Sequence, residues 1–94
     1  MQSENPDISK SFAVLGHPTK ARIFRYLLRM TKIKGEPVVP TMVAIKMSLA
    51  TATVAYSMKR MAEAGILTRR VTGRYTFYDI DPSFISQVEE YFEL

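Results

Sequence analysis

Residues 48–80 read SLATATVAYSMKRMAEAGILTRRVTGRYTFYDI, and this stretch decides the fold. Small hydroxyl residues open it, and an apolar pattern with the helical period predicts a helix at about residues 51–64. Gly65 ends that helix, as glycine commonly does. The residues that follow alternate between apolar and polar on both sides of Thr72-Gly73, which predicts a β-hairpin. Its strands are expected at about 67–71 and 74–80.

The expected helix has one side for the core and one for a partner. Val54 lies at the centre of the apolar side, with Met58 and Met61 beside it when each residue advances by 100°. The opposite side carries Ala52, Tyr56, Lys59 and Glu63, flanked by Thr53 and Arg60. Hydroxyls, a tyrosine and cations on an outer side suit the major groove of DNA, where such side chains contact bases and phosphates.

The hairpin divides in the same way. If Val71 lies opposite Arg74, one face carries Leu67, Arg69, Tyr78 and Ile80, of which the apolar three pack on the helices. The other face carries Thr68, Arg70, Tyr75 and Phe77. Arg70 and Arg74 then lie near the tip, where positive charge is favoured along the DNA backbone or in the minor groove.

Four further helices are predicted around this stretch. Gly16-His17-Pro18 separates the first two, and Asp81-Pro82 starts the last with an N-cap followed by proline. The prolines and glycine of residues 31–40 exclude a helix interior there, and Val38-Val39 is expected to add a short strand against the hairpin. The helices are expected at about 7–15, 19–30, 41–47 and 82–92. The fold class is therefore mainly α with a small β-hairpin.

Length and composition limit the function classes. The 94 residues form one domain, 1–94, with no room for a second core. The formal net charge of +4, with basic residues concentrated at 20–34 and 59–74, fits a polyanion-binding surface. A solubilising surface charge is the alternative. No apolar run approaches the roughly 20 residues that span a bilayer, and no secretory signal opens the chain, so we expect a cytoplasmic protein.

Catalytic chemistry finds no support in the sequence. There is no glycine-rich phosphate loop, no nucleophile with a base at motif spacing and no carboxylate pair in an apolar setting. Glu89 and Glu90 are neighbours on a helix and point about 100° apart. We therefore expect neither an enzyme nor a cofactor.

Three motifs resemble one family. FAVLGHPTKARIFRYLL at 12–28 resembles the opening signature of ArsR-type winged-helix repressors. TVAYSMKRMAEAGIL at 53–67 resembles their recognition helix, and GRYTFY at 73–78 is similar to the returning strand of their wing. The motifs stand in the family's order, and the resemblance covers about residues 8–92. It implies a winged helix-turn-helix fold and DNA binding.

Carried over by position, the resemblance implies DNA-facing roles on the helix and the wing. These positions are Thr51, Ala52, Thr53, Tyr56, Ser57, Arg70, Gly73 and Arg74, and the outer side of the helix adds Lys59 and Arg60. Ser57 stands where the family usually has His, and Ala55 where it usually has Ser. These departures leave the operator sequence unpredictable.

The terminal helices predict a homodimer. The last helix carries more large apolar residues than one monomer face should expose, and an exposed apolar patch usually marks an interface. In the resembling family the first and last helices form the dimer. The expected interface residues are Ile8, Phe12, Leu15, Phe84, Val88, Tyr91 and Phe92. The alternative is that both helices only cap the core of the monomer.

Metal sensing, common in the family, is not expected here. One class of site uses Cys, which this chain lacks, and another uses His on the last helix, where there is none. The oxygen ligands Asp81, Glu89, Glu90 and Glu93 suit zinc poorly without imidazole or thiolate. They fit a solvated acidic face, and His17 fits a turn or cap.

The sequence thus predicts a homodimeric DNA-binding transcriptional regulator, expected to be a repressor, that binds a palindromic operator without a metal. The alternative is a winged-helix module that binds other proteins, such as an accessory transcription factor. The operator, the regulated genes, the inducing signal and the choice between repressor and activator stay open.

Overall fold

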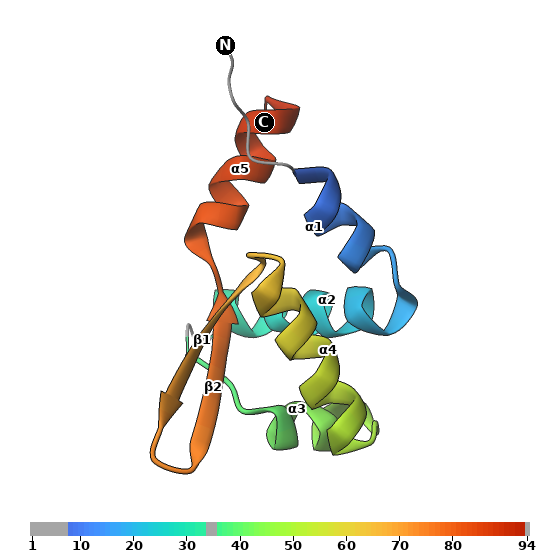
Figure 1. Cartoon of the computed structure of the whole chain (residues 1–94), viewed down its shortest axis with the longest axis vertical. Coiled ribbons are helices and arrows are strands. Elements are labelled where there is room, and N and C mark those ends of the chain that lie inside the picture. Colours follow the sequence, from blue (N-terminus) through green and yellow to red (C-terminus); the bar gives the residue numbers. More distant parts are fainter. Residues whose placement is uncertain (1–7, 34–35, 94) are drawn as a thin grey trace.

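The computed structural model of the chain describes residues 8–33 and 36–93. These residues form five helices and one antiparallel hairpin (Figure 1). In chain order the elements are α1 (Ile8–Leu15), α2 (Pro18–Ile33), α3 (Pro40–Met47), α4 (Thr51–Glu63), β1 (Leu67–Thr72), β2 (Tyr75–Ile80) and α5 (Pro82–Phe92). The prediction of a mainly α fold with a small hairpin is confirmed. Position 7, where the first helix was expected to begin, lies outside the described residues.

One boundary differs from the prediction by several residues. α2 continues to Ile33, whereas the expected helix ended at residue 30. The loop was assigned to residues 31–40 because of Gly35, Pro37 and Pro40. Residues 31–33, however, contain no helix breaker, and a proline constrains mainly its own position and the one before it. The helix therefore continues through Ile33, and residues 34–35 lie outside the described residues.

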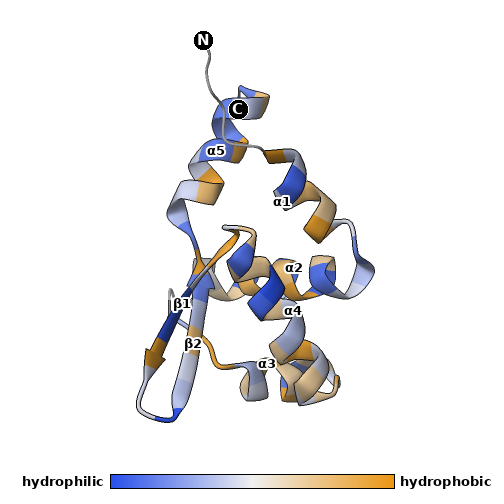
Figure 2. Cartoon of the chain, viewed as in Figure 1, coloured by the Kyte–Doolittle hydropathy of each residue, from blue (hydrophilic) through white to orange (hydrophobic). Residues whose placement is uncertain are grey.

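The core lies where α2, α4, the hairpin and the start of α5 meet. Ile23, Val54 and Met58 are fully buried, and they belong to a cluster that also takes in Ile66 and Phe84. The Phe84 ring meets Phe24 edge-on, with ring centroids 5.8 Å apart. Polar and apolar residues alternate along the helices (Figure 2), and the buried apolar residues of α2 and α4 belong to this cluster.

Two sharp helix ends position α4. At its C-terminus Gly65 has φ +80°, and the amides of Gly65 and Ile66 donate to the carbonyls of Ala62 and Met61. This pair of hydrogen bonds is the Schellman motif, for which glycine is the favoured residue. At the other end Ser48, with φ 56°, closes α3 so that α4 begins three residues later. α3, this turn and α4 form a helix-turn-helix.

The hairpin pairs two residues out of the expected register. Thr72 lies opposite Tyr75, and Leu67 opposite Ile80, so Val71 faces Thr76 rather than Arg74. The loop is therefore Gly73-Arg74, with φ +62° at Gly73. Because a shift of two residues preserves the alternation, the predicted faces are correct although the register was wrong. Leu67, Tyr78 and Ile80 are buried.

The expected strand near Val38 is present as a single bridge. The Val38 amide donates to the Tyr78 carbonyl, and the Val38 carbonyl accepts from the Tyr78 amide, both at 2.8 Å. This bridge attaches the segment before α3 to β2. Asp81 caps α5 as expected, since its carboxylate accepts from the Ser83 amide at 2.8 Å. Within residues 8–33 and 36–93 no helix is long and apolar enough to span a membrane.

Candidate nucleic-acid interface

The outer side of α4 is open to solvent. Tyr56 is 62% exposed, and Lys59 and Arg60 are exposed beside it, whereas Val54, Met58 and Met61 on the opposite side are fully buried. Thr51, Ala52 and Thr53 are exposed at the start of the helix. No other part of the described chain therefore covers the side of α4 that is predicted to meet a partner.

Ser57 does not lie on this side. Its exposed fraction is 3%, so it does not share the exposed outer side of α4 with the other residues predicted there, and its contact with DNA stays a prediction. The physical reason is helical geometry, because Ser57 is three residues after Val54 and lies only about 60° from it around the helix axis. The DNA-facing assignment of Ser57 came from the family resemblance. The advance of 100° per residue already placed Ser57 near the buried side of the helix.

The cations on α4 are not neutralised to any great extent. Arg60 donates to Glu63 at 3.1 Å, but both side chains are about half exposed, and such a pair on a helix surface contributes little. Lys20 of α2 lies with its Nζ 5.7 Å from the centre of the Tyr56 ring. α2 thus adds a cation to the edge of the outer side of α4.

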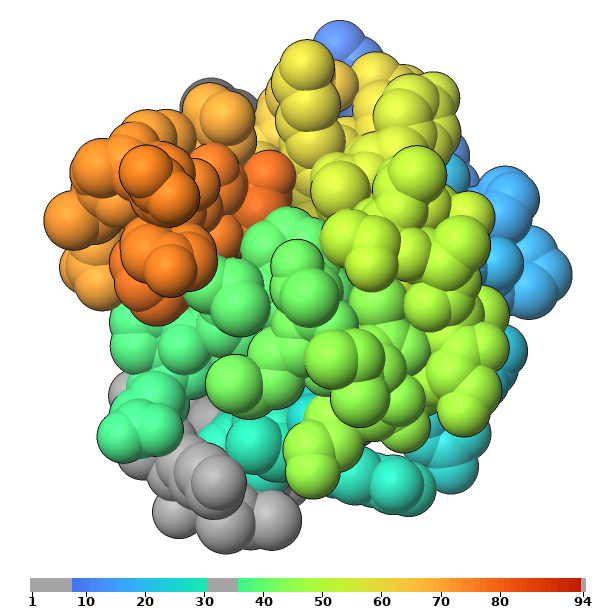
Figure 3. All heavy atoms as spheres, turned by 90° about the horizontal axis from the view of Figure 1, so that it is seen from below, coloured from blue at the N-terminus to red at the C-terminus, as the bar shows by residue number. Residues whose placement is uncertain are grey.

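The hairpin brings further positive charge beside the helix-turn-helix. Arg74 lies in the loop and Arg70 on β1, and both are exposed, as is Arg69. Gly73 occupies the loop position that needs a positive φ. Figure 3 shows α3, α4 and the hairpin side by side on one face of the molecule.

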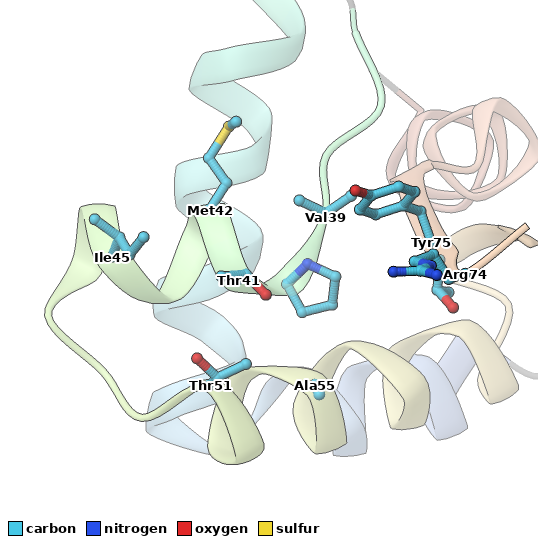
Figure 4. Close-up of a pocket in the computed structure, with 10 residues that line it drawn as sticks. Val39, Thr41, Met42, Ile45, Thr51, Ala55, Arg74 and Tyr75 are labelled. Carbon is cyan, nitrogen blue, oxygen red and sulfur yellow. The ribbon is translucent and has the colours of Figure 1, made fainter. Parts of the chain in front are cut away.

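A groove of about 570 Å³ lies between α3, the start of α4 and the hairpin (Figure 4). We call it the α3–wing groove. Its lining is mostly apolar, and α3 adds the exposed side chains Met42 and Ile45 near it, 52% and 72% exposed. Arg74 and Tyr75 approach from the hairpin. The lining residues are Val39, Pro40, Thr41, Met42, Ile45, Thr51, Ala55, Arg74, Tyr75 and Thr76.

A second hollow, of about 360 Å³, lies on the other side of α4, against the start of α2. We call it the α2–α4 hollow. Its lining is rich in hydroxyls and contains a lysine. The lining residues are His17, Thr19, Lys20, Ala52, Thr53, Tyr56 and Ser57. His17 shapes the start of α2, because its Nδ1 accepts from the Thr19 amide at 3.3 Å.

The residues predicted for a dimer interface divide into three groups, which are buried, partly buried and exposed. Ile8 and Phe84 are buried in the monomer, 6% and 2% exposed, so the prediction that they lie on a free surface is wrong. Leu15 and Val88 are partly buried against the core. Phe84 lies in the first turn of α5, close to the core, whereas the end of α5 extends away from it beside α1 (Figure 1).

Three aromatic residues remain exposed at this end, and we call them the aromatic cluster. Phe12, Tyr91 and Phe92 are 36%, 51% and 50% exposed. The rings of Phe12 and Phe92 stack with centroids 5.7 Å apart, and Tyr91 meets Phe92 edge-on at 5.1 Å. α1 and α5 thus carry one continuous apolar surface.

Sequence reasoning missed Lys20, Met42 and Ile45. Only the packing of α2 on α4 brings Lys20 to Tyr56. In α3, Val43 and Ala44 are buried, and Met42 and Ile45 are the apolar residues that point outward. Met42 and Ile45 could have been predicted from the sequence, because they are apolar residues on the side of the helix opposite its buried residues.

Acidic residues and His17 do not gather into a metal-binding group. Across the part of the chain that the structure describes, no three His, Cys, Asp or Glu residues come close enough together to hold a metal ion.

A helix-turn-helix followed by a hairpin, with both on one face, defines the winged helix-turn-helix class, and the chain has this fold. No protein-family model matches the sequence, and no curated protein matches it as a relative. Solved structures do match, and they include ArsR-family transcriptional regulators.

Three of these structures are informative. A crystal structure of a possible transcriptional regulator for arsenical resistance is 21% identical, with a TM-score of 0.70 over 89% of this chain and 81% of that one. A crystal structure of an ArsR-family transcriptional regulator is 17% identical, with a TM-score of 0.73 over 99% and 90%. The solution structure of a homodimeric winged helix-turn-helix DNA-binding domain from Mycobacterium bovis, described as a possible ArsR-family regulator, is 11% identical, with a TM-score of 0.68 over 99% and 87%. At these identities the similarity establishes the shared fold.

Proposed function

We propose that this protein is a cytoplasmic, homodimeric regulator of transcription that binds double-stranded DNA of defined sequence. α4 enters the major groove, and Arg70 and Arg74 of the hairpin lie along the flanking backbone. The regulator acts as a repressor. It needs no metal ion, because the chain has no Cys and its last helix has no His to serve as the ligands that such sites use.

One observation carries this proposal. The outer side of α4 is exposed, bears Lys59 and Arg60, and lies on the same face as the arginines of the hairpin. A helix of this kind fits the major groove, and cations on either side of it can contact phosphates. The net charge of +4 is consistent with a polyanionic partner.

The aromatic cluster supports the homodimer. Phe12, Tyr91 and Phe92 are large, exposed and contiguous, which is the usual mark of an interface. A second copy offers the same apolar surface, so a two-fold axis through α1 and α5 covers both. Two α4 helices then lie roughly 34 Å apart, the spacing of successive major grooves on a palindromic operator.

Selection of bound sites from random DNA tests the DNA-binding function. We expect an enriched palindrome whose half-sites lie about one helical turn apart. The affinity for the selected site should fall steeply with salt, because bound cations release counterions from the DNA. A slope of log K against log salt near zero, or no enriched sequence, contradicts the proposal.

Light scattering after size-exclusion chromatography tests the dimer. Phe92→Lys places a charge in the proposed interface, and we expect a monomer that binds one half-site but loses the preference for a palindrome. Ser86→Lys, on an exposed position of the same helix, is the matched control and should remain a dimer. A monomeric wild type, or a dimeric Phe92→Lys, argues against this interface.

A second candidate function rests on the α3–wing groove. Met42 and Ile45 are apolar and exposed on the face assigned to DNA, which is unusual for a surface that contacts phosphates. In this alternative the groove binds an apolar segment of another protein, and the domain is an accessory factor. A monomer that does not bind mixed-sequence DNA at low salt would favour this function over the first.

A further inference from the structure

Ser57 is buried on the side of α4 that faces α2, and it lines the α2–α4 hollow. Within the described residues its hydroxyl has no hydrogen-bond partner. The other buried serine, Ser11, does have one, because it donates to the Ala64 carbonyl at 3.1 Å. A buried hydroxyl without a partner costs stability, so its persistence at the wall of a hollow points to a ligand that accepts from it.

The rest of the hollow carries the charge and donors of an anion site. Lys20 supplies an ammonium group, and Thr19 and Thr53 supply hydroxyls. α2, which has 16 residues, begins at the hollow and presents the positive end of its dipole. No Asp or Glu is among the described lining residues. An oxyanion with several acceptor oxygens matches these groups, and a metal ion does not.

We propose that the α2–α4 hollow binds one phosphoryl group, and that a backbone phosphate of the DNA bound by α4 supplies it. This inference rests on the proposed function. Lys20 neutralises the phosphate, Ser57 donates its hydroxyl to a phosphate oxygen, and Thr53 contacts the same group from the first turn of α4. A phosphate held here lies at the edge of the major groove that Tyr56 enters, so it fixes the depth and register of α4.

Two substitutions with matched controls measure the contribution of the site. Lys20→Gln removes the charge but keeps most of the stem, and we expect affinity to fall about tenfold at low salt and the slope of log K against log salt to decrease by about 0.9. Lys10→Gln, an exposed lysine on α1, should change neither. Ser57→Ala should lower affinity about fivefold, whereas Ser86→Ala on α5 should not.

Thermal unfolding separates a binding role of Ser57 from a structural one. Because the hydroxyl has no partner in the free protein, Ser57→Ala should melt at or above the temperature of the wild type. A clear drop in melting temperature would reveal a partner inside the chain and overturn the role assigned to Ser57.

Neutral methylphosphonate linkages identify the source of the phosphate. Each linkage of the selected site is neutralised in turn. Neutralising one of them should lower the DNA affinity of the wild type about tenfold and leave the affinity of Lys20→Gln unchanged. That result assigns the hollow to the DNA backbone. If no linkage behaves in this way, and millimolar inorganic phosphate shifts the amide resonances of Thr19 and Ser57 in the wild type but not in Lys20→Gln, the site takes a free phosphorylated ligand.

If neither response occurs, the phosphate site is refuted whatever the protein does with DNA. If the wild type binds no duplex at all, the proposed function fails, and the titration with inorganic phosphate still decides whether the hollow is a phosphate site. DNA binding that is unaffected by Lys20→Gln and Ser57→Ala leaves the function standing and overturns this inference.

Discussion

The two sides of α4 differ in chemistry although they flank the same helix. Towards α3 and the hairpin lies the larger, mostly apolar α3–wing groove, and towards α2 lies the smaller α2–α4 hollow with its hydroxyls and lysine. The exposed ridge of α4 between them carries Lys59, and Tyr56, which also lines the α2–α4 hollow, forms the edge of this ridge. The hollow therefore favours a negatively charged group, whereas the groove offers a mostly apolar surface with Arg74 and Tyr75 on its hairpin side. This difference predicts that charge substitutions and apolar substitutions around α4 have separable effects.

The largest effect is expected from Thr53→Glu. A carboxylate in the α2–α4 hollow would repel the phosphate that we place there, and repulsion at close range near a protein surface is on the order of several kcal/mol. We expect DNA affinity to fall about 100-fold. In Thr53→Gln the new side chain has nearly the shape of Glu without its charge, so DNA affinity should fall less than about tenfold. Equal losses, measured by fluorescence anisotropy, would mean that this side of α4 senses no charge.

Arg74→Gln tests the hairpin edge of the α3–wing groove. Removal of one phosphate contact should lower affinity about tenfold at low salt and decrease the salt slope by about 0.9. Arg25→Gln on α2 is the control, since Arg25 is exposed and lines neither the groove nor the α2–α4 hollow. An unchanged slope for Arg74→Gln would remove the hairpin from the interface.

Tyr56→Ala tests the ridge between the two sides. The exposed ring is expected to contact a base, so its removal should weaken binding to the selected operator about fivefold and to unrelated DNA less than about twofold. The two affinities are compared at one salt concentration. Equal losses would make Tyr56 a phosphate contact or a bystander.

Ile45→Ala should have the smallest effect. The side chain is 72% exposed on α3 and carries no charge, so the salt slope should stay constant and affinity should change less than about threefold. Stability should change by less than about 0.5 kcal/mol, as for most exposed positions. A larger loss of affinity with an unchanged slope would show that the apolar groove itself contacts DNA.

Much of the fold follows from local patterns in the sequence. The period of Val54, Met58 and Met61 defined the inner side of α4. Gly65 and Asp81 marked helix boundaries, because a glycine at a helix end and a capping carboxylate act on backbone groups only a few residues away. The hairpin faces were predictable because alternation survives a shift of two residues. The register was not, because it depends on where the tight loop forms.

The candidate site was less predictable, because it depends on packing between distant segments. Nothing in the local sequence of Lys20 shows that it lies over Tyr56, 36 residues later in the chain. Phe84 and Phe92 are similar in type and lie on the same helix, yet one is in the core and the other is exposed. Their difference arises because α5 packs on the core up to Val88 and its C-terminal end lies beyond it, which no pattern within the helix reveals.

The hydrogen bond from Ser11 to the Ala64 carbonyl crosses between the helix that we assign to subunit pairing and the end of α4. In the homodimer that we propose, this hydrogen bond links α1 of each subunit to the C-terminal end of its own α4. A small rotation of one subunit against the other would then shift the C-terminal end of α4. Affinity for an operator could then be adjusted at the subunit boundary, far from any base pair.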